Sequence, residues 1–147
     1  MTVTNLRRTP SLELNFAAVP DRLGQVRGAV RSWLVRISMD ESRIADLLLA
    51  VDEACTNAVE HGHRGDGGPV SLTGRVEGDR LHIVVADHGR WKPQDPEPDQ
   101  MRGRGMAIIR AVVPDVEIRT GDTGTVVEMR VRIPERGGRE GSARFGA

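Results

Sequence analysis

A chain of 147 residues, of which 38% are hydrophobic and 29% charged, has the length and composition of one globular domain with a core of ordinary size. The charges of its 21 basic and 21 acidic residues cancel, which argues against binding to nucleic acid or to an anionic membrane through overall net charge. The longest apolar runs fall far short of the ~20 residues that span a bilayer, and the N-terminus lacks the apolar core of a signal peptide. We therefore expect a cytoplasmic protein that finds its partners through specific sites.

The first half of the chain reads as one strand followed by two helices. Apolar and polar residues alternate over residues 12–16, which predicts a half-buried strand. Pro20 then opens a helix with one apolar face. A second helix is predicted from a cap at Ser38 or Asp40 to about residue 61, because Gly62 is a natural stop. The apolar face of the first helix consists of Leu23, Val26, Val30, Trp33, Leu34 and Ile37.

The second half alternates strands with loops. Strands are predicted over residues 70–76 and 80–87, joined by a turn at Gly78-Asp79. Residues 88–101 are rich in Pro, Asp and Gln without periodicity, so they read as a long mobile loop of the kind that often forms a lid. The remaining elements are a short helix from about Arg104 to Val113 and two strands over residues 116–120 and 125–133.

This order of elements predicts an α+β fold. Its architecture is a two-layer α/β sandwich, in which a mixed, mostly antiparallel sheet carries all helices on one face. The other face is left to solvent or to a partner. We assign residues 11–134 to the single domain, residues 1–10 to a flexible N-terminus, and the polar, glycine-rich residues 135–147 to a disordered tail.

A ladder of polar residues runs along one side of the predicted second helix. Within LLLAVDEACTNAVEHGH, residues 47–63, the side chains of Glu53, Asn57 and His61 recur every four residues and therefore climb one side of the helix. They lie on a flank away from the apolar stripe that faces the core. Acidic and amide residues usually occupy helix surfaces because they are well solvated, so a plain solvated face is the alternative to a functional ladder.

Three further segments combine features of a nucleotide site, each with a plainer alternative. Asp87 ends an apolar strand, where a carboxylate needs hydrogen bonds, and Gly89 leaves room for a flat ligand; a turn cap explains Asp87 equally. The run RGRGMAII, from Arg102, offers glycines, arginines and a helix N-terminus for phosphate, although flexible loops and nucleic-acid contacts share this composition. Gly124 and Thr125 start the last strand, where a turn is a sufficient explanation.

In this order the segments resemble a known set of motifs. Glu53-x-x-x-Asn57, Asp87-x-Gly89, Gly103-x-Gly105 and Gly124-Thr125 resemble the N, G1, G2 and G3 boxes of the GHKL ATPase superfamily, which includes gyrase, histidine kinases and mismatch-repair ATPases. Within this superfamily, the small size of the chain and its segment DEACTNAVEHG resemble the anti-sigma-factor serine/threonine kinases. The resemblance covers about residues 11–134 and implies a histidine-kinase-like ATPase domain of the Bergerat type.

The resemblance implies a role for each matched residue. Asn57 would coordinate Mg²⁺ through its amide oxygen, and Glu53 would orient and deprotonate the attacking hydroxyl group. Asp87 would accept a hydrogen bond from the adenine amine, and Gly89 would let the base pack closely. Backbone N–H groups after the G2 glycines would hold the phosphates, and an arginine would offset the charge on the γ-phosphoryl group. The residues implied to contact the phosphates or the adenine end are Arg102, Gly103, Arg104, Gly105, Met106, Gly124 and Thr125.

The implied function is that of an ATP- and Mg²⁺-dependent serine/threonine kinase and anti-sigma factor, which phosphorylates a small anti-sigma-factor antagonist protein. Its implied partners are the sigma factor and the antagonist, without direct binding of nucleic acid or membrane. A homodimer is also implied. Leu12, Leu14 and Trp33 exceed what a small core needs, which predicts a dimer surface on the first strand and helix.

Other interpretations stay open. Trp91 stands where the G1 box normally has its second glycine, which favours a nucleotide-sensing module without phosphotransfer as the main alternative. An orphan histidine-kinase catalytic domain is disfavoured, because no helical segment with a phospho-accepting histidine precedes the domain. His61 and His63 with Asp66 suggest a metal site, but their spacing matches no closed zinc site. The single cysteine, Cys55, is predicted to be a buried small hydrophobic residue rather than a nucleophile.

Overall fold

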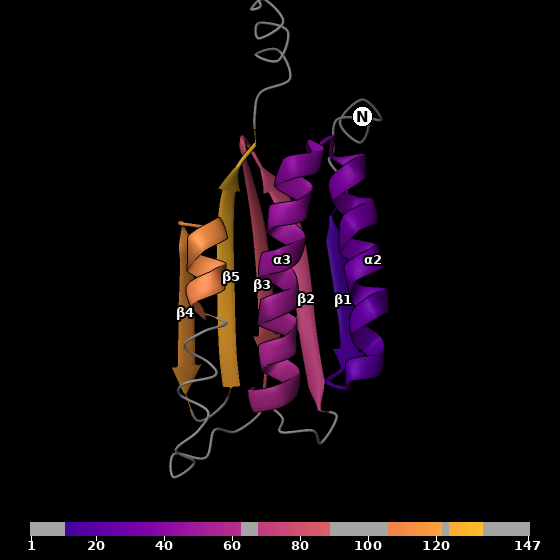
Figure 1. The fold of residues 1–147 in the computed structure, drawn as a ribbon, viewed down its shortest axis with the longest axis vertical. Coiled ribbons are helices and arrows are strands. Elements are labelled where there is room, and N and C mark those ends of the chain that lie inside the picture. The colour runs from indigo at the N-terminus through magenta and orange to yellow at the C-terminus, as the bar shows by residue number, and fades with distance from the viewer. Residues whose placement is uncertain (1–10, 63–67, 89–105, 122–123, 134–147) are drawn as a thin grey trace, which may run out of the picture.

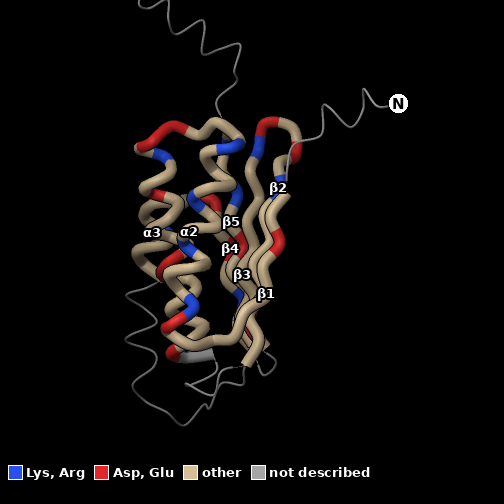
Figure 2. Tube along the Cα trace, turned by 90° about the vertical axis from the view of Figure 1, so that its right-hand side faces the viewer, with Lys and Arg blue, Asp and Glu red and all other residues tan. Residues whose placement is uncertain are grey.

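The computed structural model describes residues 11–62, 68–88, 106–121 and 124–133. Within these ranges the helices form one layer and a five-stranded sheet forms the other (Figures 1 and 2). A short helix at residues 106–112 lies between β3 and β4 in the chain. The other elements are β1 (Leu12–Ala17), α2 (Pro20–Arg36), α3 (Glu41–Asn57), the π-helical turn η1 (Ala58–Gly62), β2 (Pro69–Glu77), β3 (Arg80–Asp87), β4 (Val116–Gly121) and β5 (Gly124–Arg132).

The sheet has the strand order β1-β2-β3-β5-β4, and every neighbouring pair is antiparallel. Its register aligns Leu72, Val85 and Val127 across the three central strands, and all three side chains are buried. Because directly opposed residues share a face of the sheet, this row defines the face that packs against the helices. The predicted two-layer α+β sandwich with an antiparallel sheet is therefore confirmed.

The caps of the two long helices follow from their sequences. Pro20 occupies the first turn of α2, where its missing N–H group costs nothing. At the start of α3 the Asp40 carboxylate accepts a hydrogen bond from the Arg43 N–H group at 2.9 Å. Ser38, the other predicted cap, precedes the helix in a left-handed conformation with φ of 68°. Asp40 is therefore the N-cap. The α-helix ends at Asn57, earlier than the predicted end near residue 61, and the chain continues as the π-helical turn η1 to Gly62.

Trp33 corrects the predicted dimer surface. Its side chain is 2% exposed, and its ring lies against Gly74 of β2, where an added Cβ atom would collide with the ring. Leu12 and Leu14 are partly buried and pack against the same core. The expectation of surplus apolar residues is therefore wrong for Trp33, because the absence of a side chain at Gly74 creates room for the indole between α2 and the sheet.

The open face of the sheet carries a network of charged side chains. His82 Nε2 lies 2.8 Å from a Glu128 carboxylate oxygen, while Arg75 approaches His82 Nδ1 at 3.2 Å. Arginine can only donate, so Nδ1 accepts and Nε2–H donates to Glu128. This hydrogen bond, with the nearby Arg119 and Arg130, lowers the pKa of Glu128. The charged side chains of the open face thus pair with one another.

Several predictions fall outside the described residues. They include the flexible residues 1–10, the tail at 135–147, and the loop at 88–101 apart from His88. The start of the short helix at Arg104 also lies outside. Among the helices that the structure describes, none has the length and apolar character needed to span a bilayer.

We expect Gly74→Ala to lower the free energy of unfolding by about 1–3 kcal/mol, because the new methyl group would overpack the Trp33 ring. Gly24→Ala is the matched control. Gly24 lies in α2 with no atom within 4 Å of an added Cβ, so this variant should be neutral or more stable by up to about 1 kcal/mol. Urea denaturation of both variants provides the measurement, and equal stabilities would contradict the assigned packing.

Candidate functional site

Three polar side chains are buried in the described part of the chain. They are Asn57 at 8%, Asp87 at 4% and Thr125 at 3% exposure, and every other buried side chain there is apolar or glycine. Moving a polar group out of water is costly, so buried polar side chains are usually kept for a structural or functional reason. All three are among the site residues predicted from the sequence.

The end of α3, the end of β3 and the start of β5, which carry these three residues, meet at one end of the sandwich (Figure 1). Asn57 is the last residue of α3, and η1, which follows it directly, packs against β3 and β5. Asp87 is the last residue of β3 and is paired with Thr125 of β5. Both lie on the helix-facing side of the sheet, two residues from the buried pair Val85 and Val127. A cluster of buried polar residues thus lies where α3 and β3 end and β5 begins.

Gly124 is required by the close approach of β5 to β3. It has φ of +130°, and an added Cβ atom would collide with the Asp87 carbonyl oxygen and lie 2.9 Å from His88 Cα. Only glycine adopts this conformation readily and leaves this space. The plainer interpretation of Gly124 as a turn residue is therefore incomplete, because the residue also sets the position of the Asp87 backbone.

Asn57 and Glu53 differ in exposure although they lie one turn apart on α3. The Asn57 side chain makes no hydrogen bond within the residues that the structure describes, although it is buried. Glu53 is half-buried and makes no ion pair within the same residues. A buried amide oxygen without a hydrogen-bond partner among the described residues suits a ligand or a metal ion, while a partly solvated carboxylate suits proton transfer.

Asp52 is a neighbour of the site that the sequence analysis missed. Its carboxylate lies 3.1 Å from Arg27 Nη1 and so links α3 to α2 beside Glu53. Burial raises the pKa of Asp52, and the Arg27 charge partly opposes this effect. Because the ion pair joins two different helices, no spacing along the chain reveals it. The one signal in the sequence is that Asp52 directly precedes Glu53, a predicted site residue.

The structure describes only some of the remaining predicted site residues. Met106, the first described residue of the short helix, is 6% exposed and packs in the core. The other predicted phosphate and lid residues, together with His63 and Asp66 of the metal alternative, lie outside the described residues: Gly89, Trp91, Arg102, Gly103, Arg104 and Gly105. Within the described ranges no cluster of three or more His, Cys, Asp or Glu side chains offers a metal site.

Cys55 has the predicted structural role. The residue is 1% exposed in the core of α3, and burial raises the pKa of its thiol to about 12. A protonated thiol is a poor nucleophile at neutral pH. Cys55 therefore contributes packing rather than chemistry.

Comparison with known proteins agrees with this geometry. The model of the histidine kinase-like ATPase domain family matches residues 16–131, which cover the strands and helices that form the buried polar cluster. The chain belongs to the histidine kinase-like ATPase domain family.

Within this family the chain groups with the serine-protein kinases named RsbW. It is 32% identical to serine-protein kinase RsbW of Bacillus pumilus over 142 residues, which cover 85% of this chain and 88% of that protein. It is 31% identical to serine-protein kinase RsbW of Bacillus subtilis over 140 residues, with the same two coverages of 85% and 88%.

A solved structure supports the same grouping. The crystal structure of the RsbU and RsbW domains of Rv1364c from Mycobacterium tuberculosis superposes with a TM-score of 0.69 at 31% identity. The match covers 84% of this chain and 32% of that longer chain. The predicted ATPase-type sandwich and the predicted kinase family are therefore confirmed.

We expect Gly124→Ala to lower the free energy of unfolding by more than about 1 kcal/mol, because alanine disfavours the positive φ and collides with the Asp87 backbone. Gly121→Ala is the matched control on the paired strand: an added Cβ atom there meets no atom within 4 Å. Urea denaturation measures both, and an unchanged Gly124→Ala variant would show that β5 does not need this contact.

Proposed function

We propose that the chain is an ATP-dependent serine/threonine kinase and anti-sigma factor that phosphorylates a small anti-sigma-factor antagonist protein. The observation that carries the proposal is the identity of the buried polar residues. Asn57, Asp87 and Thr125 belong to three different sequence motifs, yet they are the polar side chains that the described fold buries, and it buries them at one end. Membership of a family of serine-protein kinases supports the chemistry.

Asp87 is proposed to select the base of the nucleotide. Its carboxylate is 4% exposed, and in such a dry environment a charge-assisted hydrogen bond to an exocyclic amine is strong. Guanine would present a carbonyl oxygen where adenine presents its amine, so the carboxylate would face another acceptor and lose the bond. Gly124 holds the backbone of Asp87 in place, and Thr125 lines the same side of the sheet.

Asn57 is proposed to hold Mg²⁺. Its buried amide oxygen is a hard donor without a hydrogen-bond partner in the described part of the chain, which fits a cation that prefers oxygen ligands. The ion would neutralise charge on the phosphates. The backbone N–H groups from Gly103 to Met106, with Arg102 or Arg104, are proposed to hold the phosphates of ATP.

Glu53 is proposed as the general base for phosphoryl transfer. The hydroxyl oxygen of a serine in the antagonist would form a bond to the γ-phosphorus while the bond from that phosphorus to the bridging oxygen breaks, releasing ADP. The proton of the serine hydroxyl group would pass to the Glu53 carboxylate. Its half-buried position, one turn from Asn57, supports this role, because a metal-bound triphosphate at Asn57 would lie near a carboxylate that an incoming protein can still reach.

The sigma factor and the antagonist are the proposed partners, in the cytoplasm, with no direct contact to nucleic acid or membrane. We also propose a homodimer. Because Trp33 is in the core, a dimer surface on β1 and α2 would use other side chains, among them Val35, which is 52% exposed. Trp91 favours one other function, an ATP-sensing module without phosphotransfer, and the kinetic test below separates the two.

We expect Asp87→Asn to weaken Mg-ATP binding about ten- to a hundredfold, because a charge-assisted hydrogen bond contributes roughly 1.5–3 kcal/mol. Asp79→Asn is the control, since Asp79 lies in the turn at the opposite end of β3 and should keep full affinity. Isothermal titration calorimetry measures both. A folded Asp87→Asn variant with wild-type affinity would exclude Asp87 as the adenine contact.

We expect Glu53→Gln and Asn57→Ala to fail in different ways. Glu53→Gln keeps the size of the side chain but removes the base, so ATP affinity should hold while single-turnover transfer to the cognate antagonist falls by about 10²–10⁴-fold. Asn57→Ala should lose both affinity and transfer. If the wild-type protein binds ATP tightly but transfers no phosphate to the antagonist, the protein is a sensing module.

A further inference from the structure

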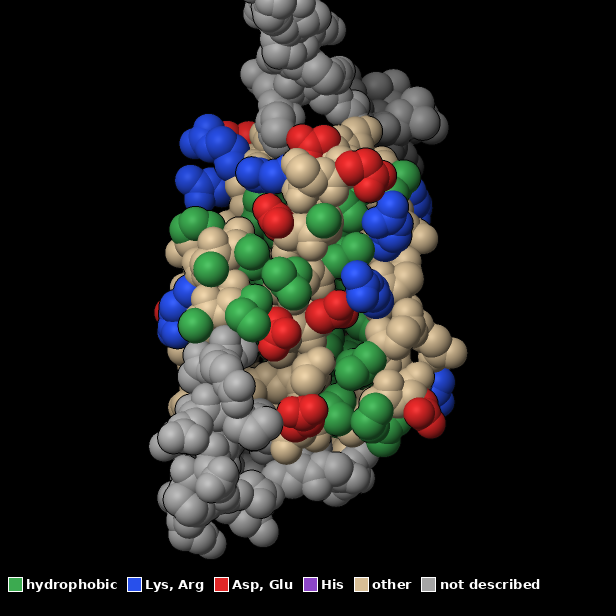
Figure 3. All heavy atoms as spheres, viewed as in Figure 1, with side chains coloured by type: hydrophobic (Ala, Val, Ile, Leu, Met, Phe, Trp, Pro, Cys, Tyr) green, Lys and Arg blue, Asp and Glu red, His purple; other side chains and the backbone are tan. Residues whose placement is uncertain are grey.

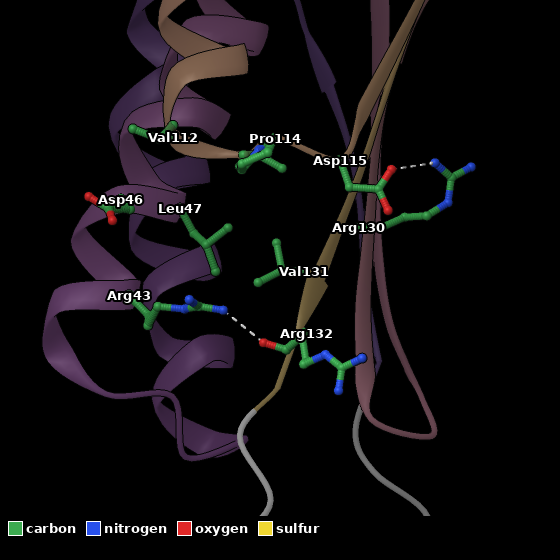
Figure 4. Close-up of a pocket in the computed structure, with 10 residues that line it drawn as sticks. Arg43, Asp46, Leu47, Val112, Pro114, Asp115, Arg130, Val131 and Arg132 are labelled. Atoms are coloured by element: carbon green, nitrogen blue, oxygen red, sulfur yellow. Dashed lines mark hydrogen bonds and ion pairs between the residues drawn. The ribbon is translucent and has the colours of Figure 1, made fainter.

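An apolar pocket lies at the end of the molecule opposite the buried polar cluster. It has a volume of about 240 Å³ and opens between the first turns of α3, the residues that follow the short helix, and the end of β5 (Figure 4). Leu47 and Val113, both almost fully buried, form its base. The lining residues are Arg43, Asp46, Leu47, Val112, Val113, Pro114, Asp115, Arg130, Val131 and Arg132.

The volume of this pocket points to a protein side chain as its occupant. Pockets for small molecules usually measure about 300–1,000 Å³, so 240 Å³ is small for a cofactor or metabolite. One large apolar side chain of a partner is a closer fit, and such anchors in dry pockets commonly dominate protein interfaces.

The apolar surface continues from the pocket along both helices. Leu49 lies one turn beyond Asp46 on α3 and is 43% exposed, and Ile108 lies one turn before Val112 on the short helix and is 36% exposed. Figure 3 shows hydrophobic side chains gathered over the helix layer beside acidic ones. Leu49 and Ile108 are two of the three large hydrophobic side chains that the described surface exposes. The helix layer therefore has an exposed apolar patch next to the pocket.

The uncompensated charge along α3 beside this patch is negative. Asp46 and Glu53 flank Leu49 on the same side of α3, and neither makes an ion pair within the described residues. Of the pocket arginines, Arg43 donates to the Arg132 carbonyl oxygen at 2.8 Å and points away from Asp46 (Figure 4). This bond positions its guanidinium group but leaves its charge, so on α3 two carboxylates without an ion pair stand against one such arginine. Arg130 lies 3.4 Å from Glu128.

Two other arginines near the patch do not change its excess of negative charge. Arg132 lies 3.5 Å from Asp79 and is neutralised there. Arg110, exposed on the short helix, is two residues from both Ile108 and Val112 and therefore points to the other side of that helix. The patch thus combines apolar contact area with unpaired carboxylates on α3.

We propose that the docking patch, formed by Asp46, Leu49, Ile108, Val112 and the pocket, binds a segment of a partner protein that presents one large apolar side chain flanked by Lys or Arg. The apolar side chain enters the pocket, and the basic side chains pair with Asp46. Charge complementarity of this kind selects the partner and speeds its association. The pocket lies at the end of the molecule opposite the proposed nucleotide site, so binding needs no ATP.

The test uses two matched helical peptides that share a phenylalanine anchor and differ only in flanking lysines or glutamates. Both are titrated into nucleotide-free ¹⁵N-labelled protein. We expect the lysine peptide to shift the amide signals of Leu49, Ile108 and Val112, and to bind at least about fivefold more tightly than the glutamate peptide. Raising the salt concentration should reduce this difference.

Variants locate the binding on the patch. Leu49→Ser and Asp46→Lys should each weaken the lysine peptide by about fivefold or more, while their NMR spectra show an intact fold. Glu77→Lys is the matched control for the charge reversal, because Glu77 is an exposed carboxylate at the end of β2, outside the patch. Its affinity should equal that of the wild type.

Three outcomes would overturn the proposal. Equal binding of the two peptides would remove the role of charge, and signal shifts confined to β1 and α2 would place the site elsewhere. Loss of wild-type self-association in Leu49→Ser, seen by sedimentation velocity, would show that a second copy of the chain covers the patch. Because these measurements use no ATP, their failure is distinct from a failure of phosphotransfer.

Discussion

The contact of Gly124 with the end of β3 is the constraint on which the site depends. A glycine with φ of +130° lets β5 begin directly against the Asp87 carbonyl group, and this approach sets the register that pairs Asp87 with Thr125. The same register continues through Val85 and Val127 into the core. One backbone contact therefore ties a buried carboxylate to the packing of the whole sheet, which gives a polar site the rigidity that ligand recognition needs.

The two faces of the sheet manage charge in different ways. On the open face, Glu128 is surrounded by His82, Arg119 and Arg130, so its negative charge is compensated and its pKa lowered. On the helix side, the described residues include buried polar side chains only at the end where α3 and β3 finish. Water-exposed charge is thus stabilised by mutual pairing, while the few buried polar groups are kept together at a single place.

Helix α3 connects the two functional ends that we propose. Its last turn supplies Asn57 and, one turn earlier, Glu53, whereas its first turns border the apolar pocket through Asp46 and Leu47. Its core stripe, with Cys55 as an inert packing residue, holds it against the sheet. A partner segment bound at the start of α3 would lie on the same helix that carries Glu53, the proposed base. Because a helix is rigid, the distance between the bound segment and Glu53 would be fixed, which suits a kinase that acts on a protein.

The sequence by itself determined the order of elements, the apolar faces of the helices and the ladder of Glu53 and Asn57, because local periodicity and capping depend on neighbours in the chain. It also marked Asp87 and Thr125 through ordered motifs. Only the tertiary structure decided that Trp33 belongs to the core, that Gly124 supports Asp87, that Arg27 pairs with Asp52, and that a pocket forms beside Asp46. Each of these depends on contacts between distant segments, and no spacing along the chain encodes the space that a missing side chain leaves on a neighbouring strand.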